Sequence, residues 1–108
     1  MTAASLLSTL QKAANHLTDA TIAHLGATLT LKETKTALEI AKAHMLQTGV
    51  EGKNEAQREA VMRLELAGQY DAVGEAEEAL ADARCSLEVA RIDWDLAKYS
   101  VRACEVLA

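Results

Sequence analysis

The chain lacks proline and phenylalanine altogether, and it has only five glycines, two tyrosines and one tryptophan among 108 residues. Because proline in a helix interior costs about 3 kcal/mol, its absence is typical of long uninterrupted helices. The shortage of aromatic side chains excludes a core built around large rings. We therefore expect one all-α domain with a thin core of alanine and leucine.

Other absences narrow the function. No apolar run approaches the roughly eighteen residues of a membrane-spanning helix, and the first residues lack the basic start of a secretory signal. The formal net charge of −5 argues against nucleic acid as a partner, because nonspecific binding needs a basic face. We expect a cytoplasmic protein that does not bind membranes.

The sequence also lacks the motifs of catalysis and metal binding. It has no nucleophile elbow, no glycine-rich phosphate loop and no zinc-type spacing of cysteine and histidine. The adjacent acids Glu77 and Glu78, like Asp93 and Asp95, fit a solvated helix face. We expect no enzyme activity, no metal and no cofactor.

Two apolar rows repeat every seven residues in the second half of the chain, and the spacing is that of a coiled-coil seam. The large row is Val73, Leu80, Leu87, Trp94 and Val101, and the small row is Ala76, Ala83, Ala90, Ala97 and Cys104. We call these rows, with their counterparts below, the inner seam. Alanine at every seventh position lets a partner helix come unusually close, as in the antiparallel packing called an Alacoil.

The first half repeats this pattern. Its large row is Leu10, Leu17, His24, Leu31, Leu38 and Met45, and its small row is Ala13, Ala20, Ala27, Thr34, Ala41 and Thr48. The rows keep their phase across Gly26, which predicts one helix over residues 3–47. In the alternative, the helix stops at Gly26 and restarts at Thr30, where Thr30-Leu31-Lys32-Glu33 has the form of a capping box.

Residues 48–53 are expected to form a turn between two antiparallel helices. Gly49 can take the left-handed conformation that ends a helix, and Gly52 adds freedom to the turn. Asn54 is a good N-cap for a helix over residues 54–67, with Gln57 placed to return the hydrogen bond.

The segment Gly52-Lys53-Asn54-Glu55-Ala56-Gln57-Arg58 resembles a turn found in small helical-hairpin proteins of phage and prophage genomes. The resemblance covers roughly residues 40 to 100, and its distinctive part is the Gly-Lys-Asn-x-x-x-Arg turn. It implies structural roles for Lys53, Asn54 and Arg58. It also implies a phage setting, and hence the host cytoplasm, rather than an activity.

After the turn, the apolar phase shifts between Ala67 and Val73, with Gly68 and Gly74 on either side of the shift. Each glycine costs about 1 kcal/mol in a helix relative to alanine. We therefore predict a kink or short loop over residues 68–72, followed by a helix over residues 73–107. Cys85 and Cys104 would lie about 28 Å apart on that helix, too far for a disulfide within the chain.

A further apolar row lies nearly opposite the inner seam of this last helix. This outer row consists of Cys85, Val89, Ile92, Leu96, Tyr99, Ala103 and Val106. A hairpin needs only one apolar stripe on each helix, so a second stripe calls for another cover. We expect a homo-oligomer, a dimer or larger, in which the outer row is the interface of a helical bundle.

A basic row of Arg84, Arg91 and Lys98 also recurs at seven-residue spacing, opposite neutral positions of the first helix. It is therefore expected to lack a counter-charge within the chain. Arginine binds phosphate through a two-pronged contact, which makes this row a candidate site for a nucleotide-like anion.

Three functions follow in order of preference. The first is a noncatalytic homo-oligomer that acts by protein–protein interaction. The second is an anti-defence sponge that holds an anionic nucleotide signal between subunits. The third, which the acidic charge disfavours, is an accessory factor in phage DNA replication or recombination. His24 is expected to be a polar residue that fixes the register of the inner seam.

Overall fold

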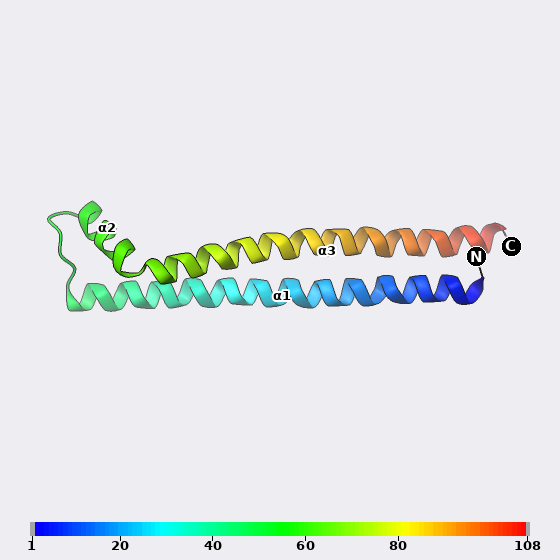
Figure 1. Cartoon of the computed structure of the whole chain (residues 1–108), viewed down its shortest axis with the longest axis horizontal. Helices are drawn as coiled ribbons and strands as arrows, with labels where there is room; N and C mark the ends of the chain where they lie inside the picture. The colour runs from blue at the N-terminus through cyan, green and yellow to red at the C-terminus, as the bar shows by residue number, and fades with distance from the viewer. Residues whose placement is uncertain (1, 108) are drawn as a thin grey trace. The chain divides into compact units, whose positions relative to one another are not determined.

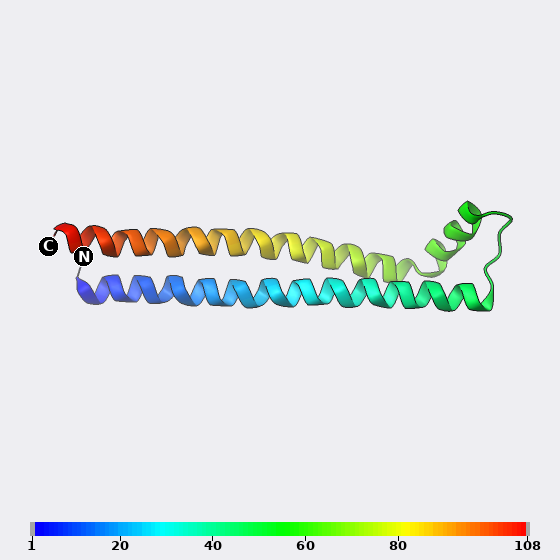
Figure 2. The same cartoon turned by 180° about the vertical axis from the view of Figure 1, so that it is seen from behind.

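The computed structural model describes residues 2–107, which form three helices and no strand: α1 (Ala3–Thr48), α2 (Glu55–Glu65) and α3 (Ala67–Leu107). They divide into two compact units. One unit joins the residues up to Gly26 with those from Ala81 onward, and the other is Ala27–Leu80. In each unit a stretch of α1 lies beside an antiparallel stretch of α3 (Figures 1 and 2). The predicted all-α helical hairpin is confirmed.

Helix α1 is continuous, as the uninterrupted phase of its apolar rows predicts. The alternative, a break between Gly26 and Thr30, is wrong. Several threonines of α1 donate their hydroxyls back to helix carbonyls: Thr18 to Ala14 at 3.0 Å and Thr21 to Leu17 at 2.7 Å. These bonds satisfy the side chains inside the helix, so the threonines need not end it.

The unit with both ends of the chain has a core of small residues. Ala90 is fully buried, Ala20 and Leu87 are each 7% exposed, and Leu17 packs against them. All four belong to the predicted inner seam. Burying a leucine side chain contributes about 1.5–3 kcal/mol, whereas an alanine contributes mainly by letting the helices approach. The core of this unit is therefore narrow.

The unit Ala27–Leu80 buries larger side chains. Leu38 of α1 and Ala76 and Leu80 of α3 are buried, as the inner seam predicts. Met62 of α2 and Leu66, which follows α2, are buried as well. The short helix α2 therefore gives this unit a bulkier core than the alanine rows alone provide.

The interruption of the second helical stretch lies at Leu66, so the predicted kink over residues 68–72 is wrong. Leu66 has φ −105° and ψ 23°, which ends α2, and α3 begins at the next residue. The chain stays hydrogen-bonded there: Leu66 N–H donates to Met62 and Tyr70 N–H donates to Leu66. The change of backbone conformation at Leu66 accommodates the shift in the phase of the apolar positions. It allows both Met62 and Leu66 to be buried.

Candidate interaction surface

The outer row occupies one exposed face of α3 within the unit that holds both chain ends. All seven of its members are exposed in the single chain. The large side chains are Val89 (52%), Ile92 (51%), Leu96 (60%), Tyr99 (63%) and Val106 (86%). Cys85 and Ala103 are exposed as well. The residues of the inner seam, on the other side of α3, are buried or half-buried. Successive members follow steps of three and four residues, so the row stays on one face along the helix.

Helix α1 also carries exposed large apolar side chains, which the sequence analysis missed. They are Leu7, Ile22, Leu25, Leu29, Ile40 and Leu46. Ile22, Leu25 and Leu29 follow steps of three and four residues, but the same steps beyond them reach Thr18 and Lys32, and the other three side chains are isolated. The short stripe of Ile22, Leu25 and Leu29 was the available signal, and it covers only two turns of α1. The outer row of α3 is the more continuous surface.

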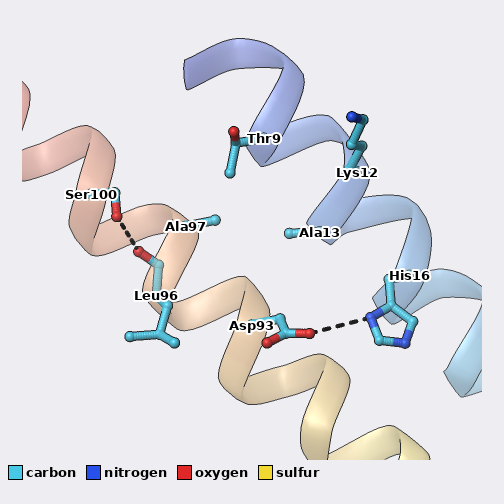
Figure 3. Close-up of a pocket in the computed structure, with 8 residues that line it drawn as sticks. All are labelled: Thr9, Lys12, Ala13, His16, Asp93, Leu96, Ala97 and Ser100. Carbon is cyan, nitrogen blue, oxygen red and sulfur yellow. Dashed lines mark hydrogen bonds and ion pairs between the residues drawn. The ribbon is translucent and has the colours of Figure 1, made fainter. Parts of the chain in front are cut away.

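An open groove of about 470 Å³ runs beside the outer row, between α1 and α3 (Figure 3). It is lined by Thr9, Lys12, Ala13 and His16 of α1 and by Asp93, Leu96, Ala97 and Ser100 of α3. Ala13 and Ala97 point toward each other, and their short side chains leave the space open. Leu96 therefore belongs both to the outer row and to the lining of the groove.

Four of the five polar side chains that line this groove form local contacts. His16 Nδ1 lies 3.5 Å from Asp93 Oδ2, and both side chains are about half exposed. The Ser100 hydroxyl donates to the Leu96 carbonyl at 2.9 Å, and the Thr9 hydroxyl donates to the Ser5 carbonyl at 3.0 Å. The groove thus holds a cross-helix polar contact, which the sequence analysis missed. Two polar residues on facing flanks of the inner seam were the available signal.

The basic row differs from its prediction at one position. Arg84 and Arg91 are exposed and take part in none of the ion pairs found among residues 2–107. Lys98 is half-buried, its Nζ lies 3.3 Å from Asp95 Oδ1, and it lies 5.6 Å from the Trp94 ring centroid. The expected lack of an intramolecular counter-charge is wrong for Lys98, because its partner comes from the same helix face, three residues earlier.

The turn residues lie in the unit Ala27–Leu80 and have structural contacts. Gly49 follows α1 with φ +95°, and Gly52 has φ +147°. Asn54 caps α2 by accepting a hydrogen bond from Gln57 N–H at 2.9 Å, and the Gln57 side chain accepts one from Lys53 N–H at 2.9 Å. The returned bond therefore goes to the residue before the cap.

Arg58, for which the resemblance implies a structural role, lies against Gly52 of this turn. A side chain at Gly52 would meet the Arg58 backbone nitrogen at 2.9 Å and the Arg58 Cγ at 3.0 Å. The stem of Arg58 thus covers the glycine, and the turn closes tightly against the first turn of α2. Only glycine combines this approach with a positive φ.

The same unit contains a second cluster that the sequence analysis missed. The Tyr70 ring lies 5.2 Å from Lys42 Nζ and 4.9 Å from the Arg63 guanidinium carbon. Among residues 2–107, no group forms a hydrogen bond of normal geometry with its buried hydroxyl. The Lys42 ammonium is stabilised chiefly by the Tyr70 hydroxyl and, to a smaller extent, by the Glu39 and Glu59 carboxylates. These interactions raise the pKa of Lys42 above its ordinary value of 10.5.

The remaining candidates have simple environments. His24 is half-buried in the inner seam, as its position predicts. Cys85 is exposed, Cys104 is half-buried, and both are free thiols. Across residues 2–107, no three histidine, cysteine or acidic side chains gather as metal ligands would. Within the same range, no helix has an apolar stretch sufficient to cross a membrane.

Comparison with known proteins gives no assignment: no protein-family model, no curated protein and no solved structure matches the chain.

Proposed function

We propose that the protein is a noncatalytic helical protein that acts by protein–protein interaction, and that its outer row binds a second copy of the chain. The exposure of this row carries the proposal. Each of its large side chains is at least half exposed, so each still has roughly 1 kcal/mol of burial energy to gain. A helix that is apolar on two opposite faces is stabilised by a cover on both.

The spacing of the row supports a helix as the partner. Its alternating steps of three and four residues are the ones that allow side chains of one helix to fit between those of another. The second copy offers a row of the same length and spacing. Association with it also compensates for the narrow core of the unit to which the row belongs.

The test compares two leucines of nearly equal exposure. Leu96 of the outer row is 60% exposed and Leu25 of α1 is 63% exposed. The wild type should sediment as a dimer or larger oligomer at micromolar concentration, Leu96→Lys should shift it to monomer, and Leu25→Lys should not. Far-ultraviolet circular dichroism checks that both variants remain helical.

A monomeric wild type at high micromolar concentration would overturn this function. So would an equal effect of the two lysine variants, because that would indicate general hydrophobic association rather than the outer row.

A second candidate function is the binding of a nucleotide-like anion by the basic row. It is favoured by the exposure of Arg84 and Arg91, neither of which takes part in an ion pair within residues 2–107. Thermal-shift assays with cyclic and linear nucleotides test it. A stabilisation that Arg91→Glu abolishes and Lys32→Glu preserves would support the anion site, and no shift with any nucleotide would reject it.

We further propose a phage origin and hence the cytoplasm of the host cell as the place of action. This part rests on the resemblance of the turn that contains Lys53, Asn54 and Arg58. Phage genes flanking the coding sequence would support it, and a purely cellular gene neighbourhood would oppose it.

A further inference from the structure

Charged residues border the outer row on both sides and constrain how a second copy can lie on it. One edge carries Glu88, Asp95 and Arg102, and the other carries Ser86, Asp93 and Ser100, all of them exposed. In a coiled coil, such edge residues of one helix meet those of its partner and determine orientation and register. Three alignments bring at least six of the seven members of each row into contact, and they can therefore be compared by charge.

A parallel alignment brings opposite edges together. Each residue of the edge that carries Glu88, Asp95 and Arg102 then meets a residue on the other edge of the second copy, five positions later in the sequence. Glu88 would face Asp93, and by symmetry this contact would occur twice. Two acid–acid contacts without any acid–base contact disfavour the parallel arrangement.

An antiparallel alignment brings identical edges together, and two of its registers keep six members of each row in contact. In the first register, Ile92 of one copy packs against Leu96 of the other. Asp95 then meets Asp95 of the other copy at the twofold axis, and Asp93 meets Asp93 there as well. It gains contacts between Glu88 and Arg102, but like charges meet at its centre.

The second antiparallel register avoids these like-charge contacts. It layers Leu96 against Tyr99, Val89 against Val106 and Ile92 against Ala103, so the large side chains of the row are covered. Asp95 of each copy then meets Arg102 of the other, and Asp93 meets the neutral Ser100.

Contacts within one chain hold Arg102 and Asp95 where this register requires them. The Arg102 guanidinium lies 6.0 Å from the Tyr99 ring centroid, so it is held at the border of the row. Asp95 holds Lys98 at 3.3 Å through one carboxylate oxygen and has a 59% exposed side chain, so it can accept a second cation. Asp93 has a contact within its own chain, because His16 Nδ1 of α1 lies 3.5 Å from its Oδ2.

We propose that two copies of this chain associate antiparallel through the outer row, in the register that pairs Asp95 of each copy with Arg102 of the other. The inference rests on the proposed function, because it specifies the self-association proposed there. The twofold axis lies between residues 97 and 98, and each copy contributes the same edge.

A charge-reversal and mixing experiment tests the register. Asp95→Arg and Arg102→Glu each create like-charge contacts at both Asp95–Arg102 positions, so each variant alone should dimerise roughly tenfold more weakly than wild type. In an equimolar mixture, the Asp95→Arg chain has arginine at positions 95 and 102, and the Arg102→Glu chain has an acid at both positions. The mixture should therefore form a heterodimer of about wild-type affinity. Sedimentation equilibrium at a fixed salt concentration measures all four samples.

Glu88→Arg is the matched control, because Glu88 lies on the same edge and meets no charged residue of the second copy within residues 2–107. It should dimerise like the wild type. Circular dichroism confirms that every variant is helical before its association is compared.

The alternatives give different results. A loss of dimer with Glu88→Arg and no loss with Asp95→Arg would indicate the first antiparallel register and overturn the proposal. No effect of any charge reversal on a dimeric wild type would also overturn it, while the proposed function would stand. A monomeric wild type would overturn both.

Discussion

Replacing Ala90 by leucine tests the close packing of α1 against α3. Ala90 is fully shielded from solvent and lies in the core with Ala20 and Leu87. A leucine there adds three carbon atoms where the neighbouring side chains leave no room. Overpacking a well-packed core costs about 1–3 kcal/mol, and separation of the two helical stretches would also expose part of Leu87. We expect a loss of roughly 3 kcal/mol in the free energy of unfolding.

This loss corresponds to a fall of roughly 15 °C in the midpoint of thermal unfolding for a chain of this length. Thermal and urea unfolding followed by far-ultraviolet circular dichroism measure it. Because association stabilises the folded state by mass action, wild type and variant are compared at several equal protein concentrations.

Ala81→Leu provides the control. Ala81 is exposed on α3 in the same unit. Leucine and alanine have similar helix propensities, so this variant should stay within about 0.5 kcal/mol of wild type. If Ala90→Leu is as stable as Ala81→Leu, the alanines do not hold the two stretches close together, and the interpretation of the inner seam is wrong.

Three further predictions concern the unit Ala27–Leu80. Gly52→Ala should cost about 1–3 kcal/mol in urea unfolding, because φ is +147° and the new Cβ would lie 2.9 Å from the Arg58 backbone nitrogen; a neutral result would refute the close turn. Asn54→Ala should cost about 1 kcal/mol through loss of the N-cap, whereas Asn54→Asp, which keeps an acceptor, should cost much less; equal losses would argue against the cap. The raised pKa of Lys42 means that its stabilising contribution is fully present below pH 10.5 and is lost as pH rises through the folded-state value. The urea midpoint of the wild type should therefore fall toward that of Lys42→Met above pH 10.5, and a constant difference between them would contradict the role of Tyr70.

The inner seam could be predicted from the sequence because one physical requirement repeats along it. Every seventh residue must face the opposite helix, so Ala20, Leu38, Leu80 and Ala90 are all buried where the pattern places them. The continuity of α1 follows from the same repetition. A single glycine costs about 1 kcal/mol, which is too little to break a helix that packs along its length.

The place of the interruption could not be predicted in this way. Glycine propensity pointed to the segment between Gly68 and Gly74, whereas the structure changes direction at Leu66. The choice depends on burying Met62 and Leu66 together, which is a property of three-dimensional packing. Propensities of about 1 kcal/mol are smaller than the burial energy of two such side chains.

The candidate surface was predictable in part. The outer row followed from periodicity alone, and all of its members are exposed in the single chain. The contacts of individual polar side chains did not follow. The pairs of Lys98 with Asp95 and of His16 with Asp93 depend on rotamers and on the offset between helices, which a spacing pattern does not specify.

The distribution of side-chain size ties the fold to the proposed association. In the unit that carries the outer row, the inner core is built from Ala20, Ala90 and Leu87, whereas Ile92 and Leu96 face outward. A monomer gains most by placing its largest apolar side chains inside, so this arrangement gives up intramolecular stability. Small residues inside bring the two helical stretches close together, and large residues outside supply the energy for a second interface. Folding and self-association of this unit would then draw on opposite faces of one helix, and weakening either face should weaken both processes.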